Sequence, residues 1–206
     1  TMGGGIGLTQ GTSFRLVSES TVLAMPEVFI SLFPDVGATH FLSRVDRGLG
    51  YYLGLTGERI SGVGGVNLGW QNGTYLEKNK RRILADLTRL PWQGSFEKDR
   101  NLLGDFVKKT ALASPLQVTP QDQQVLAAYR KIENEFLQAV EENDFEKCIA
   151  LTNQSLQDER SRSLLSQILF LEMAKKNRNV SIESALELEW VAAVRSCELP
   201  YFREGV

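Results

Sequence analysis

The sequence predicts an α/β fold in two parts, a turn-rich α/β segment over residues 1–73 and a mostly helical region over residues 74–206. Glycine supplies the first observation, because 15 of the 18 glycines fall within residues 1–73, where they favour tight turns. The second observation is a pair of short apolar runs, Phe14–Val17 and Thr21–Met25, which are typical of strands. The third is the helical spacing of apolar residues along most of the remaining chain.

Proline and glycine divide the segment that follows the second predicted strand. Pro34 and Gly37 indicate that Glu27 to Asp35 is irregular or forms one short helical turn. Asp35 then precedes apolar residues at helical spacing up to Val45. We therefore expect a helix there, with Asp35 as its N-cap.

The later part of the chain predicts a series of amphipathic helices. A short helix is expected first over Leu49–Leu55, ending at Gly57. The others are expected at Leu76–Leu90, Phe96–Leu112, Pro120–Val140, Leu164–Ala174 and Ile182–Val194.

Composition limits the classes of function. Lys and Arg number 23 and Asp and Glu 25, a net charge of −2, which excludes a generally polycationic nucleic-acid binder but not a local basic patch. No apolar run reaches the roughly 20 residues of a membrane span, so no membrane partner is expected. Cys148 and Cys197 lack metal-site spacing and are expected to be free thiols in a reducing compartment. His40 is the only histidine, so neither a metal site nor a serine-hydrolase triad is expected.

The two ends of the sequence lack local signals that are usual at the start and the end of a folded unit. A glycine-rich loop that faces a ligand normally follows a strand, whereas one residue precedes Met2. The last residues, Glu204 to Val206, carry no helix-capping signal. We therefore expect this chain to be part of a larger protein.

Four motifs occur in order in the front part. They are Met-Gly-Gly-Gly-Ile-Gly-Leu at 2–8, Ala-Met-Pro-Glu at 24–27, Leu-Phe-Pro-Asp-Val-Gly at 32–37 and Leu-Thr-Gly-Glu-Arg at 55–59. Together they resemble the crotonase superfamily, and within it the 3-hydroxyisobutyryl-CoA hydrolases. The strong match covers residues 2–62, and a weaker one returns at Leu188-Glu189 and at 202–206. The resemblance implies a partial crotonase core, the C-terminal part of a ββα spiral, over residues 1–73.

The resemblance assigns roles to individual residues. Crotonases hold a thioester carbonyl between two backbone N–H groups; Gly4 matches the second donor, and the first, with the adenosine-binding strands, would lie upstream of Met2. Glu27 matches the catalytic glutamate, which activates water or attacks the carbonyl. Asp35 matches the second acid of the hydrolases, which contacts the hydroxyl end of the substrate. Gly7 stands where hydratases carry a further glutamate, which favours hydrolysis over hydration.

Taken one at a time, these residues have simpler explanations. A triple glycine usually forms a tight turn, Glu27 is placed to favour a helix N-terminus, and Asp35 is placed to be an N-cap. Their order and spacing together favour the catalytic interpretation. The chain departs from the family at Ala38 and Ser43 and over residues 63–70, the region that helps to close the family's pocket.

Three functions follow from the resemblance. The first is hydrolysis of the acyl-CoA substrate 3-hydroxyisobutyryl-CoA during valine breakdown in the mitochondrial matrix, with coenzyme A as part of the substrate and no separate cofactor. The alternative is a hydrolase-like component of the small subunit of the mitochondrial ribosome. A hydratase or isomerase is the third, and Gly7 disfavours it. A basic run consists of Lys78, Lys80, Arg81 and Arg82. In the ribosomal alternative these side chains would contact RNA phosphates. In an enzyme they would form a solvated helix face or contact the phosphates of CoA.

Overall fold

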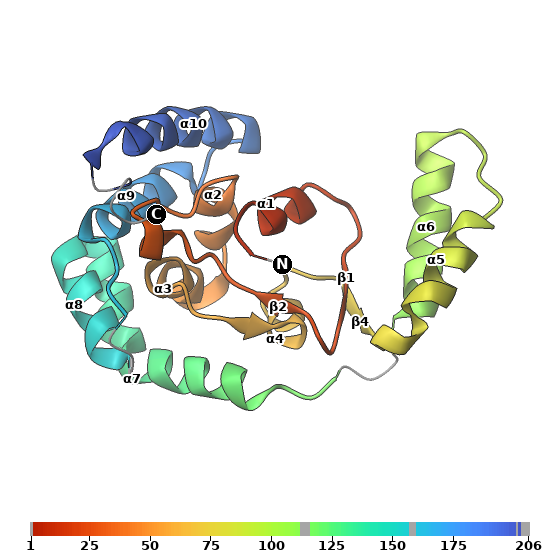
Figure 1. Cartoon of the computed structure of the whole chain (residues 1–206), viewed down its shortest axis with the longest axis horizontal. Helices are drawn as coiled ribbons and strands as arrows, with labels where there is room; N and C mark the ends of the chain where they lie inside the picture. Colours follow the sequence, from red (N-terminus) through yellow and green to blue (C-terminus); the bar gives the residue numbers. More distant parts are fainter. Residues whose placement is uncertain (1, 112–115, 157–159, 201, 203–206) are drawn as a thin grey trace.

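The computed structural model describes residues 2–111, 116–156, 160–200 and 202. Short elements dominate the front part (Figure 1). They are α1 (Gly4–Gln10), β1 (Leu16–Ser18), β2 (Val22–Leu23), η1 (Glu27–Ile30), α2 (Ala38–Leu42), η2 (Asp46–Gly48), α3 (Leu49–Thr56), β3 (Ile60–Ser61), α4 (Gly62–Asn67) and β4 (Gly73–Tyr75). Helices make up the rest: η3 (Glu77–Asn79), α5 (Lys80–Thr88), α6 (Phe96–Thr110), α7 (Pro120–Glu142), α8 (Phe145–Ser155), α9 (Leu164–Asn177) and α10 (Ile182–Glu198).

Both predicted strands are confirmed, and each finds its partner across the front part. β1 pairs in parallel with β4, and β2 pairs antiparallel with β3. Just after β2, Ala24 forms a parallel bridge with Met2, and its carbonyl accepts a hydrogen bond from the Gly3 N–H at 3.0 Å. This pairing brings the glycine-rich motif beside the segment that begins with Pro26 and Glu27.

The predicted helices are present, with ends that differ by a few residues. The helix expected to end at Gly57 does so, since Gly57 adopts a left-handed conformation at φ 64° and its N–H donates to the Leu53 carbonyl. The helix expected to reach Val45 stops at Leu42. α8 is an additional helix, and the end of the expected helix Phe96–Leu112 lies outside the described residues. The segment from Ala24 to Gly37 holds only one short helical turn, η1, as expected.

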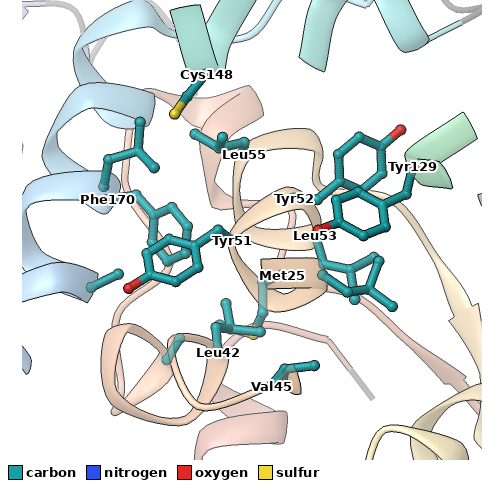
Figure 2. Close-up of a cluster of buried hydrophobic side chains, with 14 of the residues drawn as sticks. Met25, Leu42, Val45, Tyr51, Tyr52, Leu53, Leu55, Tyr129, Cys148 and Phe170 are labelled. Carbon is teal, nitrogen blue, oxygen red and sulfur yellow. The ribbon is translucent and has the colours of Figure 1, made fainter. Parts of the chain in front are cut away.

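The hydrophobic core is built around α3 (Figure 2). Every residue of α3 is buried. Tyr52 contacts Tyr129 of α7 with ring centroids 5.2 Å apart, and Phe170 of α9 packs against Tyr51 at 6.4 Å. Cys148 of α8 belongs to the same cluster. One core therefore includes residues on both sides of position 73, and the change in composition there does not separate two cores.

Helices α5 and α6 lie apart from the core (Figure 1). No residue of α5 is buried, and in α6 only Val107 is. The apolar face expected on the first of these helices is only partly covered: Leu84 is 53% exposed, and the other apolar side chains of that face are half-buried. The amphipathic pattern thus predicted the helix correctly, but this face is not buried in the core, because α5 lies apart from it.

The structure also bears on membrane crossing and on the state of the two cysteines. Among the helices of the described ranges, none combines the length and apolar character needed to cross a bilayer. Both cysteines are free, Cys148 in the core and Cys197 at the surface.

Candidate functional site

The glycine-rich motif turns the chain from a bridge into a helix. Gly3 is buried and adopts a left-handed conformation at φ 52°, and its carbonyl accepts the Ile6 N–H at 2.8 Å. α1 begins at Gly4, whose N–H finds no hydrogen-bond acceptor within the part of the chain that the structure describes. Gly4 is exposed. The backbone donor assigned to Gly4 is thus available to a ligand oxygen.

Glu27 lies directly against the backbone that leads to this donor. It is the first residue of η1 and is 7% exposed. A Cβ atom at position 3 would lie 2.6 Å from Glu27 Oε1, so a glycine at position 3 allows the carboxylate to approach. Glu27 Oε2 is buried and has no hydrogen-bond partner among the described residues. The carboxylate therefore has one oxygen free for a substrate or a water molecule.

Burial also changes the protonation of Glu27. Burial raises the pKa of Glu27 to about 7, the Glu27 backbone N–H opposes this rise, and the charge of Asp35 adds to it. A carboxyl group with such a pKa exchanges a proton near neutral pH, as a general base does.

Asp35 is not the N-cap of the following helix, so that prediction was wrong. The N-cap position of α2 is Gly37, which makes no side-chain capping bond. Val36 and Gly37 both adopt positive φ, at 52° and 86°, and only the Asp35 backbone carbonyl reaches the helix, accepting the Ala38 N–H at 2.9 Å. The half-buried Asp35 carboxylate remains close enough to Glu27 to influence its pKa, and burial raises the pKa of Asp35 itself.

A further carboxylate, which the motifs did not identify as functional, completes this acidic group. Glu189 of α10 is 2% exposed. It accepts hydrogen bonds from the Gly37 N–H at 2.5 Å, the Thr39 N–H at 3.0 Å and the Thr39 hydroxyl at 2.5 Å. Glu189 therefore supplies the cap at the start of α2 that was expected from Asp35. A signal was present in the sequence, because Leu188-Glu189 belongs to the weaker family match, although that match assigned Glu189 no role.

The charge of Asp35 acts on both of the other carboxylates, Glu27 and Glu189. Burial is the main cause that raises the pKa of Glu189, its three donors oppose the rise, and the charge of Asp35 adds to it. Within the described ranges, no group of His, Cys, Asp and Glu side chains is arranged to hold a metal ion. What this arrangement offers is proton transfer or nucleophilic attack by Glu27, beside a second acid.

A cavity of about 770 Å³ adjoins the candidate donor. Gly4 and Gly7 of α1 form one part of its wall, and Ile182 and Leu186 of α10 form another. Glu27 and Asp35 are not among its lining residues. The cavity thus reaches Gly4, while Glu27 and Asp35 lie outside its wall.

Residues 63–70, where the chain departs from the family, help to close this cavity. They form α4 and a turn that ends at Trp70, a buried residue in edge-to-face contact with Phe41 at 5.8 Å. The Trp70 carbonyl accepts a hydrogen bond from the Gln10 side chain at 3.2 Å. His40 also lines the cavity and lies 3.2 Å from the Val180 carbonyl. Burial and the charge of nearby Arg44 lower the pKa of His40.

The basic run lies outside this site. Its four side chains, on η3 and α5, are all exposed: Lys78, Lys80, Arg81 and Arg82. Lys80 forms an ion pair with Glu77 at 3.3 Å. Figure 1 places α5 on the side of the molecule away from α10, so the structure does not bring the basic run to Gly4, Glu27 and Asp35.

Comparisons of sequence relate the chain to enzymes and to one ribosomal protein. A family model described as enoyl-CoA hydratase/isomerase matches residues 1–206. Probable 3-hydroxyisobutyryl-CoA hydrolase 2 of Arabidopsis thaliana is 56% identical over 62 residues, which are 30% of this chain and 16% of that protein. The mitochondrial 3-hydroxyisobutyryl-CoA hydrolase of Mus musculus is 53% identical over 86 residues, 42% of this chain and 22% of that protein. Small ribosomal subunit protein mS47 of Neurospora crassa is 38% identical over 120 residues, 56% of this chain and 23% of that protein.

Comparison of structures agrees with the predicted fold. A crystal structure of an enoyl-CoA hydratase from Rhodobacter sphaeroides superposes with a TM-score of 0.70 and 27% sequence identity, covering 100% of this chain and 56% of that one. The matched region is thus about half of the solved chain and less than a quarter of each relative named above. The expected architecture, a partial crotonase core followed by helices, is confirmed.

Proposed function

Because the chain belongs to the enoyl-CoA hydratase/isomerase family, we propose that it hydrolyses the thioester of 3-hydroxyisobutyryl-CoA to the free hydroxy acid and CoA. One observation carries this proposal: the buried Glu27 carboxylate lies against Gly3, immediately before the Gly4 N–H, which has no acceptor among the described residues. An acid of raised pKa beside a backbone donor is the pair that acyl transfer requires.

The proposed reaction adds water across the bond between the carbonyl carbon and sulfur. The Gly4 N–H donates to the carbonyl oxygen and stabilises the negative charge that develops there, which for one such donor is worth about 3 kcal/mol. The first donor of the family's pair would come from a segment upstream of Met2. Glu27 either removes a proton from the attacking water or attacks the carbonyl carbon itself, and the CoA thiolate leaves and takes up a proton. In the second route the attack leaves an anhydride between Glu27 and the acyl group, and water then hydrolyses it to the free acid and the Glu27 carboxylate.

Asp35 is assigned to the acyl end of the substrate. Its carboxylate lies close enough to influence the pKa of Glu27, and it would accept a hydrogen bond from the 3-hydroxyl group. Such a bond distinguishes a hydroxyacyl thioester from one that lacks the hydroxyl. Since several relatives, among them the mouse protein, are named as mitochondrial, we place this reaction in the mitochondrial matrix and in valine breakdown.

CoA release by the full-length protein tests the proposal. We expect turnover of 3-hydroxyisobutyryl-CoA whose kcat/KM rises with pH through about 7 and then levels off, because Glu27 must be ionised to act as base or nucleophile. Glu27→Ala should lose this turnover. Absence of CoA release by well-folded wild-type protein across pH 6 to 9 would refute the enzymatic function.

The comparison with mS47 favours a second candidate, a structural component of the mitochondrial small ribosomal subunit. That similarity extends over 120 residues, well beyond the length of the front motifs. The exposed basic side chains of η3 and α5 would then contact RNA phosphates, and α5 has no buried residue that ties it to the core. The retained acids Glu27 and Asp35 are not explained by this candidate.

Co-sedimentation with mitochondrial small subunits tests this candidate. Arg81→Glu with Arg82→Glu should release the protein from the subunit, because two phosphate contacts become repulsive. Lys108→Glu with Lys109→Glu is the matched control, since these exposed residues of α6 carry the same charge change. Equal sedimentation of the two double variants would contradict an RNA contact through α5.

A further inference from the structure

The loop that carries Asp35 is held from the far end of the chain. Glu189 lies 152 residues after Gly37, and its two oxygens accept three hydrogen bonds from Gly37 and Thr39. The Asn177 side chain of α9 donates to the Thr39 hydroxyl at 2.7 Å. Because that hydroxyl accepts from Asn177, its own proton is directed to Glu189. Two C-terminal helices thus converge on the residues that directly follow Asp35.

This loop has a backbone conformation that needs such support. Val36 is a β-branched residue at φ 52°, a strained conformation that persists only when the surrounding structure imposes it. On the side of α1, a Cβ atom at Gly7 would lie 2.4 Å from the Val36 carbonyl oxygen. On the side of α10, Glu189 binds the Gly37 N–H. The peptide that follows Asp35 is therefore fixed between α1 and α10.

We propose that Glu189 is a positioning residue, which holds the Val36–Gly37 turn so that the Asp35 carboxylate meets the hydroxyl end of the substrate. This inference rests on the proposed hydrolase function and adds the residue that sets its preference for a hydroxyacyl group. Glu189 accepts all three of its bonds as a carboxylate. A glutamine there keeps one oxygen for Thr39 but presents an NH₂ group to the Gly37 N–H, so the turn loses its restraint.

Substrate selectivity distinguishes positioning from a general loss of folded protein. The quantity to measure is the ratio of kcat/KM for 3-hydroxyisobutyryl-CoA to that for isobutyryl-CoA, which lacks the hydroxyl. We expect Glu189→Gln to lower this ratio about tenfold or more, since small displacements of a positioned group cost rates of this order. Glu187→Gln, at an exposed position of the same helix, should leave the ratio unchanged. In an Asp35→Ala background, Glu189→Gln should lower the ratio no further.

A milder variant and a spectroscopic readout complete the test. Thr39→Val removes the hydroxyl's bonds with Glu189 and Asn177 but keeps the backbone N–H bond to Glu189. It should lower the ratio by a smaller factor, which keeps the test open if Glu189→Gln does not fold. An equal loss of kcat/KM for both thioesters, with the ratio unchanged, would overturn the positioning role. If the wild-type protein hydrolyses neither thioester, the proposed function fails and the carboxyl ¹³C resonance of Asp35 becomes the readout. It should move in Glu189→Gln and not in Glu187→Gln, and an unmoved resonance would overturn the inference.

Discussion

Glu27→Gln should abolish thioester hydrolysis and, at the same time, stabilise the folded protein at alkaline pH. Turnover should fall roughly 10²- to 10⁴-fold, the usual contribution of a positioned acid or base. At pH 8 the free energy of unfolding should rise by about 3 kcal/mol relative to the wild type. The variant thus separates the chemical role of this carboxylate from its effect on the fold.

The sign of the stability effect follows from the pKa of Glu27. Burial raises it to about 7 in the folded protein, from an ordinary value of 4.5. The folded state therefore binds the proton more tightly, and the wild type loses stability as the pH rises from 4.5 through 7. Glutamine is neutral at every pH and avoids this loss. Such a gain is typical when a strained catalytic group is removed.

Urea unfolding at pH 5 and pH 8 measures the difference. At pH 5 the pH-linked gain of Glu27→Gln in the free energy of unfolding should be below about 1 kcal/mol, because the wild type has lost little stability at that pH. Glu135→Gln, at an exposed position of α7, is the control and should show no such pH dependence. A gain that is the same at both pH values would show that Glu27 is not a buried carboxyl of raised pKa.

Gly7→Ala should impair both stability and turnover. The added Cβ would lie 2.4 Å from the Val36 carbonyl oxygen and 2.6 Å from Val36 Cγ2, so backbone must move. We expect a loss of about 1–3 kcal/mol in the free energy of unfolding. Turnover should fall about 10²-fold, because displacement of Val36 also displaces Asp35.

Gly11→Ala is the matched control for this substitution. Gly11 directly follows α1, has φ −72° and would place its Cβ at an ordinary 3.5 Å from the Leu8 carbonyl. It should therefore be tolerated with little change in urea midpoint or kcat/KM. If Gly7→Ala behaved like Gly11→Ala, close packing of α1 on the Asp35 loop would not matter for function.

The contact between Gly7 and Val36 gives position 7 a role in packing, in addition to its role in distinguishing hydrolases from hydratases. In the family that the motifs resemble, hydratases carry a second glutamate at this place. Here Val36 occupies the space into which any side chain at position 7 would extend. A glycine at position 7 and the close approach of the Asp35 loop are thus two aspects of one packing arrangement.

Local signals in the sequence determined much of the fold. Apolar runs bounded by polar residues predicted β1 and β2, and Gly57 predicted the end of α3, because residues adjacent in the sequence carry these signals. The four ordered motifs identified the family, whose model matches the whole chain. They also named Gly4, Glu27 and Asp35, which keep their assigned roles as predictions.

Tertiary structure decided what each of these residues contacts. Local spacing predicted Asp35 as a cap, but the left-handed Val36 and Gly37 exclude it, and Glu189 arrives from α10 instead. The raised pKa of Glu27 arises from burial beside Gly3, which requires the pairing of Met2 with Ala24. A pattern of residues specifies the conformation of a segment, whereas capping, burial and charge coupling depend on which distant segment packs against it.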